Sequence, residues 1–244
     1  MSILGVIPAR YASTRFPGKP LAMIAGQPMI QHVYERVAQC GELSRVIAAT
    51  DDERIADCVH GFGGEVVLTR ADHPSGTDRL GEVAQAHAGY DYYINIQGDE
   101  PLISAAAIDA LAAGTAAAGA EMGTLVRKLT LPADQPALDT PDVVKCAVGR
   151  DGYALYFSRH PVPYARRPEH AVYHKHIGIY IYTPAVLKRL CALPPSPLEL
   201  AESLEQLRAL EDGIRILAVA TDYDPVGVDT PADVAAVEAR LAAQ

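Results

Sequence analysis

Tryptophan is absent from this 244-residue chain, and cysteine occurs only four times. The four cysteines lie far apart and form no C-x-x-C pair, a pattern typical of reduced, mostly buried cysteines in a cytosolic protein. No apolar run approaches the ~18 residues of a membrane span. The start of the chain has no apolar segment behind basic residues, so we expect no signal peptide.

Charge and composition narrow the function classes further. The net charge is −9 and the pI about 5.3, which argues against general nucleic-acid binding. With 49% hydrophobic residues the chain can bury a substantial core. A chain of this length can form one large α/β domain, or one domain with an embellishment.

The first 34 residues contain no Asp or Glu, although the whole chain has a net negative charge. Residues 3–7 predict a first β-strand. Arg10, Arg15 and Lys19 then fall on a loop before the helix that Pro28 opens. Arginine offers a planar fork to phosphate oxygens and lysine a point charge, so several such groups suit a triphosphate. The pattern favours an anion site where a strand of an α/β sheet ends.

A solvated basic loop is the alternative, but Pro17, Gly18 and Pro20 restrict this segment and favour a built site. The loop lacks the G-x-x-x-x-G-K-[ST] pattern of a P-loop. The glycine cluster at residues 61–64 follows a helix, so we interpret it as a helix stop and not as a dinucleotide fingerprint.

Strands and helices alternate in the first half of the chain. This alternation predicts βαβ units around a mostly parallel sheet. The predicted strands are residues 3–7, 45–50, 65–68 and 92–97. One helix is predicted after Asp51-Asp52, a second after Thr77, and a third over residues 104–118.

Strands dominate residues 123–182, so we expect one domain over residues 1–244 with a β-rich insertion there. The strands of this insertion are residues 123–129, 143–149, 154–158 and 176–182. After it we expect helices at 184–192, 198–211 and 231–242, and a strand at 214–219. Such an insertion often forms a lid or a dimer surface.

Two carboxylates are candidates for a metal site. Asp99 follows the strand that ends near Gln97, and Asp229 directly precedes Thr230, the expected cap of the last helix. One or two carboxylates suffice for Mg²⁺, which keeps several waters. Each residue also has a structural alternative: Asp99 as a turn residue bonded to its own backbone, and Asp229 as an acid at a helix N-terminus.

The remaining candidates are weaker when taken alone. Residues 75–79 open a helix and are either an ordinary cap or a binding element for ribose or base. Arg159 ends a strand and could bind a carboxylate, although the basic stretch after it is more often a solvated loop. His176 and Tyr180 lie four apart on a strand and so share one face, which could equally be a core face.

Seven segments together resemble one family. Residues 7–21 read IPARYASTRFPGKPL, which resembles the signature of the sugar-activating cytidylyltransferases, most closely those specific for 3-deoxy-manno-octulosonate (Kdo). The other segments are residues 70–80, 95–101, 152–159, 176–180, 204–208 and 227–231. They occur in order along essentially the whole chain, with a looser match between Arg159 and His176.

The resemblance implies a three-layer, Rossmann-like nucleotide-binding fold of the nucleotide-diphospho-sugar transferase type. It also implies transfer from CTP to Kdo for lipopolysaccharide synthesis, with Mg²⁺ as cofactor and a cytoplasmic homodimer as the working form. The catalytic residues would be Arg10, Lys19, Asp99 and Asp229, the last two binding the metal. CTP would contact Pro8, Ala9, Arg10, Arg15, Lys19, Ser75, Gly76, Thr77 and Arg79. The sugar would contact Gln97, Arg159, His176, Tyr180, Glu205 and Gln206.

Two alternatives stay open. One is a cytidylyltransferase for a related acid, such as 8-amino-Kdo or a sialic acid. The other is a nucleotide-binding regulator without turnover, which the paired carboxylates disfavour, because a sensor needs no catalytic metal.

Overall fold

The computed structural model describes residues 1–12 and 16–242, and Arg15 lies outside these ranges. The chain divides into two compact units. Unit 1 comprises Met1–Asp109 and Pro225–Gln244, and unit 2 comprises Ala110–Asp224. The basic loop and both candidate carboxylates belong to unit 1, whereas Arg159, His176 and Tyr180 belong to unit 2.

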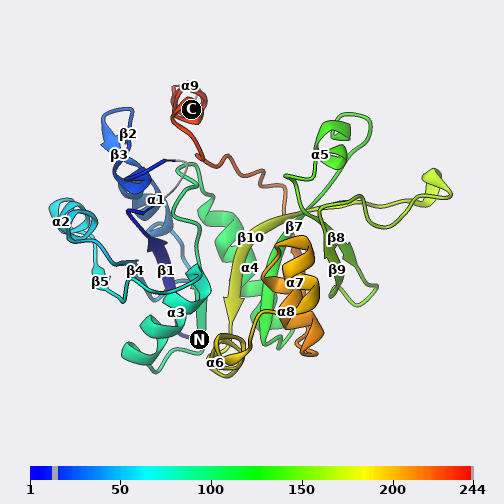
Figure 1. Ribbon diagram of the computed structural model, residues 1–244, viewed down its shortest axis with the longest axis horizontal. Helices are drawn as coiled ribbons and strands as arrows, with labels where there is room; N and C mark the ends of the chain where they lie inside the picture. Colours follow the sequence, from blue (N-terminus) through cyan, green and yellow to red (C-terminus); the bar gives the residue numbers. More distant parts are fainter. Residues whose placement is uncertain (13–15, 243–244) are drawn as a thin grey trace. The chain divides into compact units, whose positions relative to one another are not determined.

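A parallel sheet forms the centre of unit 1 (Figure 1). Strand β1 (Ile3–Ala9) pairs with β4 (Arg45–Thr50) on one side and with β6 (Tyr92–Asn95) on the other, and β5 (Val66–Leu68) extends the sheet beyond β4. Nearly every residue of β1 is buried, so helices must cover both of its faces. The helices that pack on these strands are α1 (Met29–Val37), α2 (Glu53–Gly61) and α3 (Gly76–Ala86).

The parallel strands of unit 1 bring their carboxyl ends to one edge of the sheet. The basic loop follows β1 there and leads through the short helix η1 (Lys19–Leu21) into a hairpin, β2 (Met23–Ile24) with β3 (Gln27–Pro28). The hairpin was not predicted from the sequence. Helix α9 (Pro231–Leu241) contacts β2, and Thr230 caps its start as predicted.

Unit 2 is built on a mixed sheet. Its strands are β7 (Met122–Lys128), β8 (Lys145–Val148), β9 (Ala154–Ser158), β10 (His174–Tyr182) and β11 (Leu217–Ala220). Strand β7 is antiparallel to β10 and parallel to β11, and β8 is antiparallel to both β9 and β10. Helix α4 (Ala105–Ala117) leads in from unit 1, and α5 (Gln135–Asp139), η2 (Pro168–His170) and α6 (Pro184–Ala192) follow along the chain.

The single helix predicted over residues 198–211 is wrong. The structure has two short helices, α7 (Pro197–Glu202) and α8 (Gln206–Glu211), and Ser203 between them adopts φ +52°. The Arg159 guanidinium explains the break, because it donates to the carbonyls of Glu202 and Ser203. A continuous helix would use those carbonyls for its own i→i+4 bonds.

The other predicted elements are present, with ends shifted by up to three residues. The α/β class with a mostly parallel sheet is confirmed. Among residues 1–12 and 16–242, no helix combines the length and the apolar character needed to cross a membrane.

Candidate active site

Lys19, Asp99 and Asp229 form a charged cluster in unit 1. The Lys19 ammonium lies 2.7 Å from an Asp99 carboxylate oxygen and 3.5 Å from one of Asp229. The lysine side chain is 16% exposed, while those of Asp99 and Asp229 are 35% and 50% exposed. Asp99 lies 80 positions and Asp229 lies 210 positions after Lys19 in the sequence. Their carboxylates nevertheless converge on one ammonium group that solvent can still reach.

The backbone around Gly98 places Asp99 in this cluster. A Cβ on Gly98 would lie 2.7 Å from the carbonyl oxygen of Pro8, so only glycine lets this turn approach the end of β1 so closely. The Val228 N–H donates to the Asp99 carbonyl at 2.9 Å, which ties the turn to the segment that carries Asp229. The Asp233 carboxylate accepts from the backbone N–H of Asp229 and of Thr230, and these bonds lower its pKa. Asp229 is thereby fixed at the start of α9.

Helix α3 begins beside the end of β1. Ser75 caps it by accepting from the Asp78 N–H, and Thr77 is buried in its first turn. A Cβ on Gly76 would lie 3.6 Å from the Pro8 ring and 3.6 Å from the Asn95 amide. The first turn of α3 therefore faces the same strand end as Pro8 and Ala9.

Arg79 is held inside unit 1 and is not a mobile surface cation. Its side chain is 4% exposed, bonds to the hydroxyl of Thr69 and lies 3.1 Å from Asp51. Burial lowers the pKa of this guanidinium, and the nearby positive charge of Arg10 lowers it further. The negative charge of Asp51 acts in the opposite direction and raises the pKa. Arg10 itself is exposed at the end of β1.

Sequence reasoning did not assign Asp51 to the site. The signal was present, because Asp51 directly follows β4 just as Arg10 directly follows β1. Gln97 lies two residues beyond the end of β6, directly before Gly98. The structure thus gathers the predicted nucleotide residues of unit 1 at the carboxyl ends of its parallel strands, except Arg15, which is outside the described residues.

Arg159 occupies a different environment in unit 2. Its guanidinium donates to three backbone carbonyls, those of Pro141, Glu202 and Ser203, at 3.0, 2.7 and 3.3 Å. Its own N–H donates to the Glu202 carboxylate, and its carbonyl accepts from the buried Lys145. Two of its five guanidinium N–H groups remain outside these bonds. Arg159 is thus a structural anchor as well as a candidate sugar ligand.

Lys145 and Glu202 were missed by the sequence analysis. Lys145 is fully buried, and its ammonium donates to the carbonyls of Thr140, Val143 and Arg159. Burial lowers its pKa. A lysine in the middle of a predicted strand was the only sequence signal for this network.

His176 and Tyr180 lie together, with ring centroids 5.4 Å apart. Burial lowers the pKa of His176 to about 3. The pKa of Tyr180 is well above its usual value, mainly through burial and then through nearby groups that include Glu205. Within the described part of the chain, the Tyr180 hydroxyl and the Gln206 Nε2 are buried and have no hydrogen-bond partner. A buried polar atom without a partner is costly, and a hydrogen bond from a bound polar ligand would remove that cost.

The donor set of unit 1 suits a divalent cation. Asp99 and Asp229 already converge on one cationic group, and both carboxylates are partly exposed. Over residues 1–12 and 16–242, no group of three or more His, Cys, Asp or Glu side chains gathers as a metal site. Two carboxylates completed by phosphate oxygens and waters are the coordination typical of Mg²⁺ and not of a closed structural zinc site.

Comparison with known proteins gives the family. The cytidylyltransferase family model matches residues 4–216. The 3-deoxy-manno-octulosonate cytidylyltransferase of Syntrophotalea carbinolica is 53% identical over 251 residues, covering 99% of both chains. The chain belongs to the 3-deoxy-manno-octulosonate cytidylyltransferase family. A second member, from Geobacter metallireducens, is 50% identical over 99% of this cytidylyltransferase and 98% of its own length.

Solved structures agree with this assignment. A CMP-2-keto-3-deoxy-manno-octonic acid synthetase complexed with CTP matches the cytidylyltransferase with a TM-score of 0.94 and 45% identity, over 100% of this chain and 99% of that one. A cytidylyltransferase from Leptospira borgpetersenii matches with a TM-score of 0.66 at 16% identity, over 99% of this chain and 87% of that one. The second likeness supports the fold alone.

Proposed function

We propose that this enzyme joins CTP and Kdo to give CMP-Kdo and pyrophosphate, for use in lipopolysaccharide synthesis. The observation that carries the proposal is the cluster of Lys19, Asp99 and Asp229 at the strand ends of unit 1. It occurs in a chain about half identical, over its full length, to Kdo cytidylyltransferases. A regulator without turnover has no use for this arrangement of carboxylates.

The reaction is a displacement at the α-phosphorus of CTP. The anomeric hydroxyl oxygen of the sugar forms a bond to that phosphorus, and the bond to the β-phosphate oxygen breaks. The hydroxyl proton passes to solvent and pyrophosphate leaves. Arg10 and Lys19 neutralise the negative charge on the phosphates, and Arg15 adds to the same basic loop. Charge stabilisation and positioning suffice for such a transfer, so no covalent enzyme intermediate is required.

Nucleotide recognition falls to the strand end and the first turn of α3. Pro8, Ala9 and the turn formed by Ser75, Gly76 and Thr77 offer backbone and hydroxyl groups to the cytidine. Arg79 is held by Asp51 and Thr69, so its position is preset before the nucleotide binds. A preset cation costs little reorganisation on binding.

Mg²⁺ is the proposed cofactor, with Asp99 and Asp229 as its protein ligands. When bound, it supplies positive charge to the phosphate oxygens and to the reacting hydroxyl. In this structure Lys19 is paired with both carboxylates. When Mg²⁺ binds the carboxylates instead, the Lys19 ammonium is available to the triphosphate.

The residues of unit 2 proposed to bind the acid sugar are Arg159, His176, Tyr180, Glu205 and Gln206. In unit 1, Gln97 is the proposed sugar residue. The support is the pair of unpartnered polar atoms, the Tyr180 hydroxyl and the Gln206 Nε2. The free N–H groups of Arg159 suit a carboxylate. Glu205 accepts hydrogen bonds from sugar hydroxyls.

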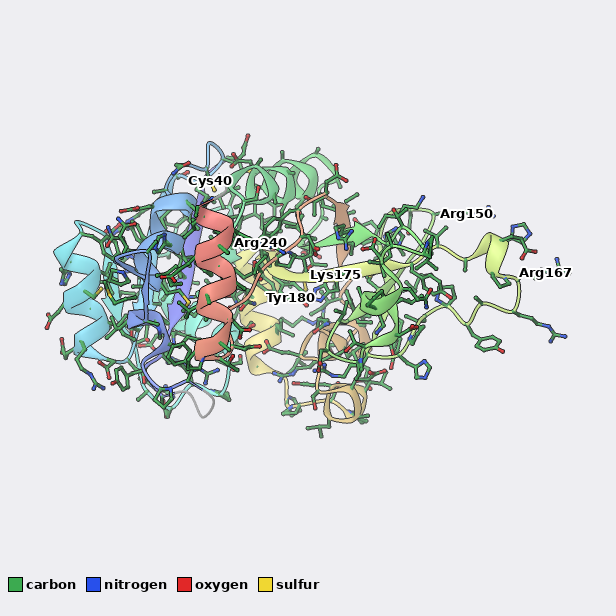
Figure 2. All side chains as sticks on the ribbon, turned by 90° about the horizontal axis from the view of Figure 1, so that it is seen from above. Cys40, Arg150, Arg167, Lys175, Tyr180 and Arg240 are labelled. Carbon is green, nitrogen blue, oxygen red and sulfur yellow. The ribbon has the colours of Figure 1, made fainter. Side chains whose placement is uncertain are left out.

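A homodimer in the bacterial cytoplasm is the proposed working form. The loop between β9 and β10 carries Tyr164 with 89% of its surface exposed, and Figure 2 shows Arg167 of the same loop pointing away from the strands of unit 2. Exposed aromatic residues are enriched where proteins associate. Light scattering of the purified chain, alone and as Tyr164→Ser, tests this proposal.

Product analysis tests the proposed reaction. Purified enzyme with CTP, Kdo and MgCl₂ should give CMP-Kdo by mass spectrometry and one pyrophosphate for each product formed. ATP or UTP in place of CTP should give less than a tenth of the product. A protein that binds CTP but forms no CMP-sugar would support the regulator instead.

A further inference from the structure

Strand β10 contains a bulge between His176 and Tyr180. Ile177 lies opposite Leu125 of β7, but Tyr180 lies opposite the neighbouring residue Thr124, so β10 carries extra residues at this point. Four residues of a regular strand span about 13 Å, whereas the two rings are 5.4 Å apart. The bulge therefore turns two separated positions into a pair of adjacent rings, with Tyr180 labelled on β10 in Figure 2.

Thr124 lies at the centre of this bulge. It is fully buried, and its Oγ1 is 3.1 Å from the Ile177 carbonyl oxygen and 2.9 Å from that of Ile179. The same oxygen is 3.1 Å from Nε2 of His176. A threonine hydroxyl has one proton and two lone pairs.

This count determines the direction of each bond. A carbonyl oxygen only accepts, so the hydroxyl proton points at the two carbonyls. All three contacts are satisfied at once when the imidazole donates its Nε2–H to Oγ1. Since neutral imidazole carries one N–H, Nδ1 is left as an acceptor.

The surroundings keep the ring neutral. The Phe157 ring packs edge-on at 4.9 Å from the imidazole, and Tyr180 packs on it as well. Burial in this aromatic environment lowers the pKa of His176 to about 3. The ring nitrogen of His176 that contacts Thr124 is Nε2, and among residues 1–12 and 16–242 the neighbouring Tyr180 hydroxyl is buried without a hydrogen-bond partner.

We propose that Thr124 is a positioning residue for sugar binding: its hydroxyl fixes His176 as the Nε2–H tautomer, so that Nδ1 accepts a hydrogen bond from a hydroxyl of the acid sugar. The proposal rests on the proposed function for the identity of the ligand. The tautomer itself is a property of the free protein and is independent of turnover.

The test uses three variants of buried threonines in unit 2. Thr124→Val removes the hydroxyl at nearly constant shape, and Thr124→Ser retains it. Thr115→Val is the matched control, because Thr115 is also fully buried but its Oγ1 has no partner among the described residues. The readouts are the ¹⁵N spectrum of histidine-labelled protein, with the His176 signals assigned from their loss in His176→Gln, and KM for Kdo and for CTP.

We expect the Nε2–H tautomer at His176 in the wild type and in Thr124→Ser, and a mixture in Thr124→Val. The KM for Kdo should rise about tenfold in Thr124→Val, the effect of one lost hydrogen bond. The KM for Kdo should be close to the wild-type value in Thr124→Ser and equal to it in Thr115→Val. The KM for CTP should stay within about twofold of the wild-type value in all three variants.

An Nδ1–H tautomer in the wild type overturns the proposal at once, even if Thr124→Val fails to fold. A wild-type Kdo KM in folded Thr124→Val also overturns it. If the wild type forms no CMP-Kdo, the proposed function fails, and the spectra still decide whether Thr124 sets the tautomer.

Discussion

Lys19 and Asp99, 80 residues apart in the chain, form an ion pair of 2.7 Å at the edge of the unit 1 sheet. The pair links the basic loop after β1 to the turn after β6. Asp229 lies 3.5 Å from the same ammonium. The cluster therefore contains both the cation for a phosphate and the carboxylates for a metal ion, which is why we place the chemistry of CTP there.

Asp99→Asn keeps the shape of the side chain and removes its charge. We expect kcat to fall on the order of 10² or more, because the cation at the phosphates loses a charged ligand. The measurement is pyrophosphate release across a range of Mg²⁺ concentrations. Asp57→Asn, at an exposed position on α2, removes the same charge elsewhere and should behave as wild type. Wild-type turnover of Asp99→Asn at low Mg²⁺ contradicts the metal role.

Gly98→Ala should lower the activity although it replaces no charged side chain. Its Cβ would lie 2.7 Å from the Pro8 carbonyl oxygen, so the turn must move and take Asp99 with it. We expect a loss of at least tenfold in kcat/KM for CTP and a lower melting temperature. Gly61→Ala is the control, since a Cβ there meets nothing within 4 Å. Equal kinetics for the two variants would show that the turn tolerates displacement.

Arg159 should be sensitive even to lysine. An ammonium keeps the charge but cannot bond three carbonyls and a sugar carboxylate together. Both Arg159→Lys and Arg159→Ala should raise KM for Kdo, with CTP affinity by calorimetry nearly unchanged and a lower melting temperature. If instead both variants weaken CTP binding and leave KM for Kdo alone, Arg159 belongs to nucleotide binding.

The lowered pKa of His176 predicts a pH dependence of stability. The unfolded chain takes up a proton below about pH 6.5, whereas the folded protein does so only near pH 3. The unfolded state thus binds more protons between these values, and stability falls as pH falls, by at most about 1.4 kcal/mol per pH unit. Urea unfolding between pH 7 and 4 should show a steeper decline for wild type than for His176→Gln. Parallel curves would mean that His176 is not buried in its neutral form.

Local signals in the sequence predicted much of the fold and named most of the residues of the candidate site in unit 1. The cap residues Asp52 and Ser75 fix helix starts within a few residues of themselves, and both predicted helices begin there. Asp99 and Lys19 were candidates because each follows a strand whose carboxyl end lies at the sheet edge. The structure brings the two side chains together, and their roles at the metal ion and the phosphates stay predictions.

Long-range contacts could not be predicted in this way. The break between α7 and α8 depends on Arg159, more than 40 residues earlier, and the single-helix prediction over 198–211 failed for that reason. The bulge in β10 likewise depends on Thr124, 52 residues before His176. Periodicity within β10 placed His176 and Tyr180 on one face, but it gave no indication that their rings are adjacent.

Pyrophosphate release with CTP and a panel of acid sugars is the most direct test of the proposed function. The panel compares Kdo, 8-amino-Kdo and a sialic acid with a reaction that contains no sugar, and Asp99→Asn serves as the inactive control. We expect kcat/KM to be highest for Kdo by at least tenfold, with release in the absence of sugar no greater than that of the control. A higher kcat/KM for either other acid, or release that is the same with and without sugar, would contradict the account.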